Sequence, residues 1–299
     1  MTKALVTGAA GFIGTALVNR LVADQWSVVA IDCRPTTYAG ATNVVADVSE
    51  SGAVRDWIDS ATTIFHLAAI ASVPQSVVDP RSDFTNTMRP VFEVLESARA
   101  VGARVVFPST ASVFDSSNPL PLDERAMIRP TSPYGAAKVA GEAYCFAYHR
   151  AYGVDARIAR FFSVFGPGLR RLAIHDLIRK AERATDELEV LGDGTQVRDY
   201  LYIDDAVNAL LTVARHGAPG EDYNIGSGVP VTALALARLI ATAMGRPELR
   251  LRTTGASFSG DTPRWYADIS KIRKLGFEPR MPFDEGLRRT VAWLTSWRG

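Results

Sequence analysis

The chain contains few cysteines. Cys33 and Cys145 are the only two among 299 residues, and they lie far apart without a C-x-x-C pair or a Cys/His cluster. This pattern argues against a disulfide scaffold and against a structural zinc site, and it is typical of a protein from a reducing compartment. We therefore expect no bound metal ion.

The sequence also lacks an excess of one charge and long apolar runs. Its 33 basic and 32 acidic residues give a formal net charge of +1, and no basic run suggests a nucleic-acid partner. No stretch approaches the roughly 18–20 consecutive apolar residues of a membrane span, and the first residues do not resemble a signal peptide. We expect a cytoplasmic protein that binds neither nucleic acid nor membrane.

Short apolar runs do alternate with amphipathic segments. Strands are predicted at residues 4–6, 28–31, 44–46, 64–67, 105–107, 156–159 and 222–225, and helices at segments such as 15–23 and 92–100. Buried strands separated by helices predict an α/β fold, a Rossmann-like doubly wound parallel sheet. We predict one domain over residues 1–165. A smaller C-terminal lobe is predicted mainly over 166–299, with parts of about 195–228 returning to the sheet.

A glycine-rich turn follows the first predicted strand and opens the first helix. Residues 6–14 read VTGAAGFIG, in which Gly8, Gly11 and Gly14 allow a tight turn and close approach to a pyrophosphate. Asp32 ends the second strand, where a carboxylate hydrogen-bonds a ribose 2′-hydroxyl and repels the extra phosphate of NADP. Arg34 nearby leaves NADP open. The pattern predicts that residues 1–165 bind NAD.

Tyr134 and Lys138 lie one helical turn apart, just after Pro133. Taken alone, this spacing is typical of any surface helix that begins with proline. Beside a dinucleotide, it favours acid–base catalysis. A phenol has a pKa near 10, and a neighbouring ammonium and a positive nicotinamide both favour the phenolate. We expect Lys138 to lower the pKa of Tyr134 toward the working pH and to hold the nicotinamide ribose.

The glycine spacing, the Tyr134/Lys138 pair and the segment LGDGTQVRDY (residues 191–200) resemble the extended short-chain dehydrogenase/reductases, specifically the NAD-dependent nucleotide-sugar epimerases and dehydratases. The resemblance covers nearly the whole chain and is closest to UDP-hexose 4-epimerases. It implies that Thr110 completes a catalytic group with Tyr134 and Lys138. His66 is interpreted as structural.

The resemblance also implies two sets of binding residues. The cofactor contacts would be Gly8, Gly11, Phe12, Ile13, Gly14, Asp32, Asp47, Val48, Leu67, Ala68, Ala69, Tyr134 and Lys138. The substrate contacts would be Ser72, Thr110, Ser112, Ser163, Arg198, Arg264 and Trp265.

Two arginines and one tryptophan carry the expectations about the substrate. The resemblance implies that Arg198 and Arg264 clamp a diphosphate; a pair between Arg198 and Asp199 is the alternative. Trp265 would disfavour an N-acetyl group at the sugar's C2, unless it is an ordinary packed aromatic residue. The sequence departs from the family at Ser163, where most relatives have Asn, and at Phe114-Asp115, which replaces Tyr-Gly.

The implied reaction follows from residues that are missing. Relatives that dehydrate carry Asp-Glu after the catalytic Thr, whereas this chain has Ala111 and Ser112. The resemblance therefore favours interconversion of UDP-glucose and UDP-galactose through a transient 4-keto sugar, with tightly bound NAD. An NAD(P)-dependent 4-ketoreductase or dehydrogenase, or a non-catalytic sensor, is the alternative. Relatives suggest a homodimer formed by helices over 84–100 and 138–152, with Pro90 interrupting the first.

Overall fold

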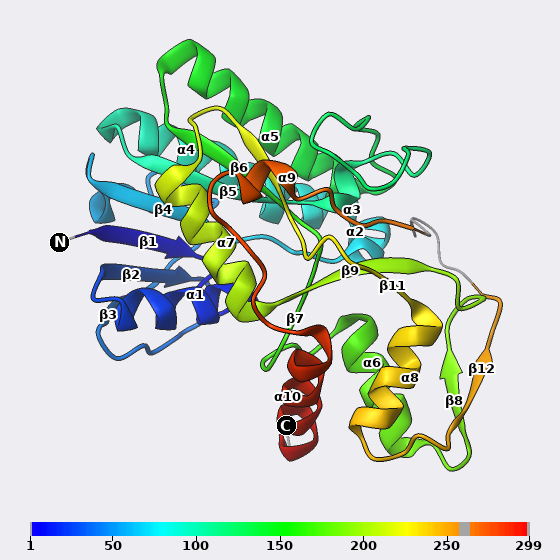
Figure 1. Ribbon diagram of the computed structural model, residues 1–299. Helices are drawn as coiled ribbons and strands as arrows, with labels where there is room; N and C mark the ends of the chain where they lie inside the picture. Colours follow the sequence, from blue (N-terminus) through cyan, green and yellow to red (C-terminus); the bar gives the residue numbers. More distant parts are fainter. Residues whose placement is uncertain (1, 257–263, 298–299) are drawn as a thin grey trace.

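Seven parallel strands form the central sheet of the computed structural model, which describes residues 2–256 and 264–297 (Figure 1). The strand order is β10-β6-β5-β4-β1-β2-β3. These strands are β1 (Lys3–Thr7), β2 (Ser27–Asp32), β3 (Ala41–Val45), β4 (Thr62–His66), β5 (Arg104–Thr110), β6 (Ala156–Phe161) and β10 (Asp222–Ile225). Each neighbouring pair is parallel, which confirms the predicted Rossmann-like sheet.

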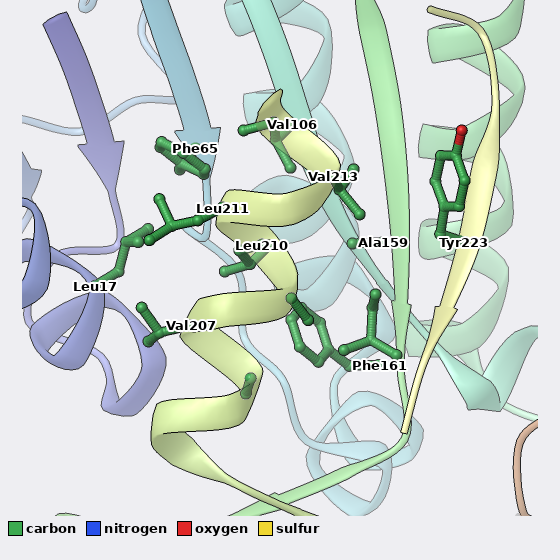
Figure 2. Close-up of a cluster of buried hydrophobic side chains, with 14 of the residues drawn as sticks. Leu17, Phe65, Val106, Ala159, Phe161, Val207, Leu210, Leu211, Val213 and Tyr223 are labelled. Atoms are coloured by element: carbon green, nitrogen blue, oxygen red, sulfur yellow. The ribbon is translucent and has the colours of Figure 1, made fainter. Parts of the chain in front are cut away.

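Helices cover both faces of the sheet because its strands carry apolar side chains on both sides. One face packs against α1 (Phe12–Ala23) and α7 (Ile203–His216), and the other against α4 (Arg89–Val101) and α5 (Pro133–Tyr152). Figure 2 shows the first face, where Leu17 of α1 and Leu211 of α7 point toward Phe65 of β4.

Short helical elements connect β4 to α4. They are α2 (Val73–Val78), α3 (Pro80–Asp83) and the π-helix η2 (Phe84–Met88). Pro90 lies in the first turn of α4, where its missing N–H costs no helical hydrogen bond. The predicted helix over 84–100 is thus a π turn followed by an α-helix. Two 3₁₀ turns, η1 (Arg55–Trp57) and η3 (Ala111–Val113), lie elsewhere in this half.

A second, smaller lobe is built from C-terminal segments. Its strands are β7 (Ser163–Phe165), β9 (Val197–Tyr202) and β11 (Pro230–Thr232), and a separate pair, β8 (Glu187–Val190) and β12 (Arg250–Thr253). Its helices are α6 (Leu172–Arg183), α8 (Ala233–Ala243) and α10 (Phe283–Ser296), which share one apolar core. The short α9 (Ser270–Arg273) packs near β10. Among the described helices, none is long and apolar enough to cross a membrane.

Candidate active site

The glycine turn after β1 presses its backbone against the segment that follows β4. Gly8 has a φ of +66°, and a Cβ atom there would lie 2.6 Å from the backbone nitrogen of Ala68. A Cβ atom on Gly14 would collide with the Gly8 carbonyl oxygen. Glycine is required at both positions because a side chain would push the turn away from β4 or from α1. The turn therefore begins α1 at the edge of a cleft lined by Gly8 and Gly11.

This cleft has a volume of about 270 Å³ and lies along the carboxyl ends of β1, β2 and β4. It brings together eight of the residues expected to contact a dinucleotide: Gly8, Gly11, Asp32, Asp47, Val48, Leu67, Ala68 and Ala69. Phe12 and Ile13 form the first turn of α1 directly after the glycine turn, and their side chains pack against the core of the second lobe. Gly14 supports the turn from behind.

Asp32 is held firmly at the end of β2. Its side chain is 6% exposed, and its carboxylate accepts hydrogen bonds from the backbone N–H groups of Ala10 at 2.9 Å and Arg34 at 3.0 Å. The Arg34 guanidinium also pairs with this carboxylate, with 3.3 Å between Nε and Oδ1. Asp32, which is expected to repel the extra phosphate of NADP, is therefore in direct contact with Arg34, whose positive charge could attract that phosphate.

Thr110, Tyr134 and Lys138 gather at the carboxyl end of β5. Thr110 is the last residue of β5, and its hydroxyl lies close enough to the buried Tyr134 phenol to oppose the rise of its pKa. Ser132 caps α5 by accepting a hydrogen bond from the Gly135 N–H at 3.1 Å, which fixes the turn that carries Tyr134. One turn later, Lys138 is 4% exposed. The structure thus brings the three predicted catalytic residues into one cluster.

The Lys138 side chain is directed toward β5. Its ammonium donates to the Pro108 carbonyl at 2.8 Å and lies 4.7 Å from the centroid of the Phe107 ring. Burial raises the pKa of Tyr134 to about 12, while the charge of Arg171 and the polar Thr110 hydroxyl oppose this rise. Burial also lowers the pKa of Lys138 to about 8. In the protein alone, burial has the largest influence on the pKa of Tyr134, and the expectation that Lys138 and a bound nicotinamide lower this pKa stays a prediction.

Sequence reasoning missed two charged residues that influence the pKa values of this cluster. Asp83, at the end of α3, is 2% exposed, and its negative charge opposes the pKa lowering of Lys138. Arg171 lies between β7 and α6, where no periodic pattern marks a function. An Arg-Arg pair after Gly166-Pro-Gly168 was the available signal for Arg171. For Asp83, no signal existed in the sequence.

Arg198, Arg264 and Trp265 lie together at the edge of the second lobe. The Arg198 guanidinium lies 4.6 Å from the centroid of the Trp265 ring and donates to the Val197 carbonyl at 2.9 Å. Arg264 forms an isolated parallel bridge with Val197 and is exposed. Residues 260–263 of the predicted GDTPR segment lie outside the described residues.

Asp199 has a structural task of its own. Its carboxylate accepts hydrogen bonds from the backbone N–H groups of Ser227, Gly228 and Ala267, at 2.7, 2.9 and 3.1 Å. The bonds from Ser227 and Gly228 join β9 to the turn after β10, and the bond from Ala267 joins β9 to the segment before α9. Together they offset the free-energy cost of removing the carboxylate from water.

Two of the three predicted serines, Ser72 and Ser163, lie at the start of an element, and Ser112 lies within a 3₁₀ turn. The Ser72 hydroxyl caps α2 by accepting from the Gln75 N–H at 3.3 Å. Ser112 lies in η3, where its hydroxyl accepts a hydrogen bond from the Thr110 hydroxyl at 3.3 Å. Ser163 begins β7 and is half-buried. Ser112 is therefore directly connected to the catalytic cluster.

A model of the NAD-dependent epimerase/dehydratase family matches residues 4–226 of this chain. The chain belongs to that family. A UDP-glucose 4-epimerase from Mycolicibacterium smegmatis is 33% identical over 97% of this chain and 97% of its own length. Relatives in this family therefore match the chain along nearly their whole length.

Two solved members of the family show the same fold. A UDP-galactose 4-epimerase structure has a TM-score of 0.85 and 33% identity, covering 98% of this chain and 99% of its own. A UDP-glucuronic acid 4-epimerase from Bacillus cereus, solved with UDP-glucuronic acid and NAD, has a TM-score of 0.89 and 28% identity, covering 98% and 99%. Family members of similar identity thus differ in their sugar.

The residues of the cleft fit the family's dinucleotide. The glycine cradle leaves no room for a Cβ atom at Gly8, and the buried Asp32 carboxylate stands at the end of β2. Both features suit a pyrophosphate close to the backbone and a ribose diol beside a carboxylate. His66, in contrast, is 1% exposed and shares a 2.9 Å hydrogen bond with the Thr7 hydroxyl, which agrees with its structural interpretation.

Proposed function

We propose that the protein is a UDP-hexose 4-epimerase that interconverts UDP-glucose and UDP-galactose with tightly bound NAD. The observation that supports this most directly is the buried Tyr134 phenol, which lies near the Thr110 hydroxyl and one turn from Lys138. This group adjoins the glycine turn through β5 and β4, since both strands end at the same edge of the sheet. A nucleotide-sugar bound there would have its reacting hydroxyl next to a potential base.

Each catalytic residue has a distinct task in this proposal. NAD, when bound, supplies a hydride acceptor for C4 and the donor that later returns the hydride. Tyr134 takes the proton from the 4-hydroxyl and gives it back to the 4-keto oxygen. The Thr110 hydroxyl holds the Tyr134 oxygen and the reacting oxygen in line. Lys138, already directed to Pro108, would hold the cofactor ribose.

Inversion at C4 requires that the nucleotide stay bound while the 4-keto sugar rotates and presents its other face to the cofactor. We assign this anchoring to Arg198 and Arg264, whose cations suit a diphosphate, with Ser72 and Ser163 as hydroxyl donors. Ala111 and Ser112 replace the acidic pair that dehydrating relatives carry after the catalytic threonine, which argues against loss of water. No net oxidation occurs, so NAD would be recycled within the site.

Trp265 is proposed to restrict the substituent at C2. Its ring lies under the Arg198 guanidinium, so it stands beside the proposed diphosphate clamp. An indole there would disfavour N-acetylated sugars. Turnover of UDP-N-acetylglucosamine at the rate of UDP-glucose would refute this assignment.

The decisive experiment uses purified protein without added cofactor. It is incubated with UDP-, dTDP- and GDP-sugars, and C4 epimers are identified by NMR. We expect UDP-galactose from UDP-glucose, and a loss of about 10²–10⁴-fold in turnover for Tyr134→Phe. Tyr144→Phe, on the exposed side of the same helix, is the matched control and should retain activity. Absence of any epimer, or full activity of Tyr134→Phe, would refute the proposal.

A 4-ketoreductase is the second candidate, and Arg34 is the residue that favours it. Its guanidinium is exposed beside Asp32, where it could pair with the 2′-phosphate of NADP instead. A reductase exchanges its cofactor at each turnover. Purified protein that carries no NAD and consumes added NADPH with a 4-keto sugar would favour this candidate over the epimerase.

We also propose that the protein is a homodimer that pairs through α4 and α5. The outer surface of these helices exposes Phe92, Tyr144 and Tyr152, at 39%, 40% and 58%. The rings of Phe92 and Tyr144 are in edge contact, with centroids 6.0 Å apart. Exposed aromatic rings gathered on adjacent helices are typical of protein interfaces.

A further inference from the structure

The connection between β2 and β3 folds back onto α1. Residues 38–41 form a tight bend, in which Gly40 has a φ of +83° and a Cβ atom on it would lie 2.9 Å from a methyl group of Val22 on α1. The Asn43 side chain fastens this bend, because its Oδ1 accepts from the Tyr38 N–H at 2.9 Å and its Nδ2 donates to the Tyr38 carbonyl at 3.1 Å. The backbone of Tyr38 is therefore held beside the helix that the glycine turn opens.

The Tyr38 hydroxyl reaches the glycine turn itself. It donates to the Ala9 carbonyl at 2.7 Å. The Thr15 hydroxyl of α1 lies 3.2 Å from the same carbonyl oxygen and 3.0 Å from the Tyr38 hydroxyl. Ala9 is fully buried, whereas Tyr38 and Thr15 are half-buried. Two hydroxyls from different elements thus converge on one backbone oxygen of the turn.

The peptide group between Ala9 and Ala10 is held at both of its polar atoms. Its carbonyl oxygen accepts from Tyr38, and its N–H donates to the Asp32 carboxylate at 2.9 Å. This peptide group cannot rotate without breaking both bonds, and a buried carbonyl left without a partner costs free energy. Tyr38 and Asp32 therefore fix the orientation of one peptide group from the same end of the sheet.

The fixed turn leads directly into the first N–H groups of α1. Gly11 precedes the helix, and within the described part of the chain no side chain caps it. The N–H groups of the first helical turn have no partner inside the helix and lie at its positive end, which suits a phosphate anion. Any shift of the Ala9–Ala10 peptide moves these N–H groups relative to the cleft at Gly8 and Gly11.

We propose that Tyr38 is a positioning residue for the cofactor: its hydroxyl fixes the glycine turn in the orientation that binds the pyrophosphate of NAD. The inference rests on the part of the proposed function in which this cleft binds NAD tightly. The Thr15 hydroxyl supports the same carbonyl and is the second member of the device. Neither hydroxyl takes part in the proton transfer assigned to Tyr134.

The test measures release of the cofactor rather than turnover. Purified protein is saturated with NADH, a large excess of NAD is added, and the loss of protein-bound NADH fluorescence gives the dissociation rate. Tyr38→Phe keeps the ring and removes the hydroxyl, so NADH should leave about three- to tenfold faster than from the wild type. Thr15→Val should also speed release, whereas Thr15→Ser, which keeps the hydroxyl, should behave like the wild type.

Tyr223→Phe is the matched control. The Tyr223 hydroxyl also bonds to the backbone, accepting from the Ala218 N–H at 2.9 Å, but it lies on β10, at the other end of the sheet from β3. Urea unfolding should show a similar loss of stability in Tyr38→Phe and Tyr223→Phe, with NADH release changed only in the former. At saturating NAD, Tyr38→Phe should recover the wild-type rate of epimerisation and its pH profile.

Three results would overturn the inference. They are wild-type NADH release from Tyr38→Phe, equally faster release from Tyr223→Phe, and a wild type that binds no NADH. A wild type that binds NADH but epimerises no sugar would refute the proposed epimerase alone, and the release rates would then still decide the role of Tyr38.

Discussion

Tyr134, Lys138 and His66 are all nearly inaccessible to solvent, and burial disfavours the charged form of each. It raises the pKa of Tyr134 to about 12 and lowers those of Lys138 and His66 to about 8 and about 3. The protein's own groups therefore keep the phenol protonated and the imidazole neutral at neutral pH. A base built in this way ionises more readily when positive charge lies nearby.

His66 should make the protein's stability depend on pH in a defined range. The unfolded side chain binds a proton near pH 6.5, whereas burial lowers the folded pKa to about 3. Between these values the unfolded state holds the extra proton, so stability falls as the pH is lowered, by at most about 1.4 kcal/mol per pH unit from this group. Above pH 6.5 the group has no such effect.

The variant His66→Gln can still hydrogen-bond Thr7 but cannot take up the proton. In urea unfolding between pH 4 and 7, the free energy of unfolding of the variant should therefore depend less steeply on pH than that of the wild type. The difference in slope should correspond to at most one bound proton, about 1.4 kcal/mol per pH unit. As a control, the His66 ring signals of the folded wild type should not titrate in this range by NMR. Equal slopes for the two proteins would contradict the prediction.

At the scale of elements, the start of α5 decides where Tyr134 stands. Pro133 occupies the first turn, the Ser132 hydroxyl caps the Gly135 N–H, and a Cβ atom on Gly135 would lie 2.6 Å from the Ser112 carbonyl oxygen. The first turn is therefore docked against η3, immediately after Thr110. A Cβ atom on Gly141 would lie 2.6 Å from the Phe107 ring, so glycine also lets the middle of α5 approach β5.

The cap residue offers a test of this docking. Ser132→Ala should cost about 1 kcal/mol of stability, because the Gly135 N–H loses its partner, and should lower kcat several-fold by loosening the turn that carries Tyr134. The matched variant is Thr232→Ala, which removes the cap of α8 in the second lobe, a 3.1 Å hydrogen bond from the Ala235 N–H. It should cost a similar stability with unchanged kcat. Equal effects of both variants on kcat would contradict the prediction.

At the scale of the whole molecule, the two sides of α4 and α5 differ in what they contact. Their inner sides cover the sheet, and α5 carries the catalytic pair, while their outer sides expose aromatic rings. Tyr148 and Tyr152 lie in edge contact with centroids 5.1 Å apart, and Arg99 lies 5.0 Å from the centroid of Tyr152. A dimer through this surface would stiffen the helix on which Tyr134 and Lys138 depend.

Charged substitution on this surface tests the dimer. Phe92→Glu should convert the protein from dimer to monomer, because it would bury a carboxylate among apolar rings without a partner. Light scattering after size exclusion measures the mass. Val45→Glu, an exposed apolar position on the edge strand β3, is the control and should remain dimeric. A monomeric wild type would contradict the prediction.

The sequence by itself determined the features that depend on local geometry. The glycine turn, Asp32 at a strand end and the Tyr134/Lys138 spacing all follow from contacts within a few residues or from the alternation of strands and helices. The parallel sheet was predictable for the same reason, although the π turn before Pro90 and the separate strands of the second lobe were not. A short element that packs only against distant segments carries little periodic signal of its own.

The tertiary structure decided which charges meet. Asp83 reaches the catalytic cluster from an element about 50 residues before Tyr134 in the chain. The direction of Lys138 toward Pro108 and the stacking of Arg198 on Trp265 are likewise long-range contacts. Sequence spacing shows that two side chains share a helix face. It does not show how deeply a phenol is buried or which cation faces it, because both depend on packing between segments remote in sequence.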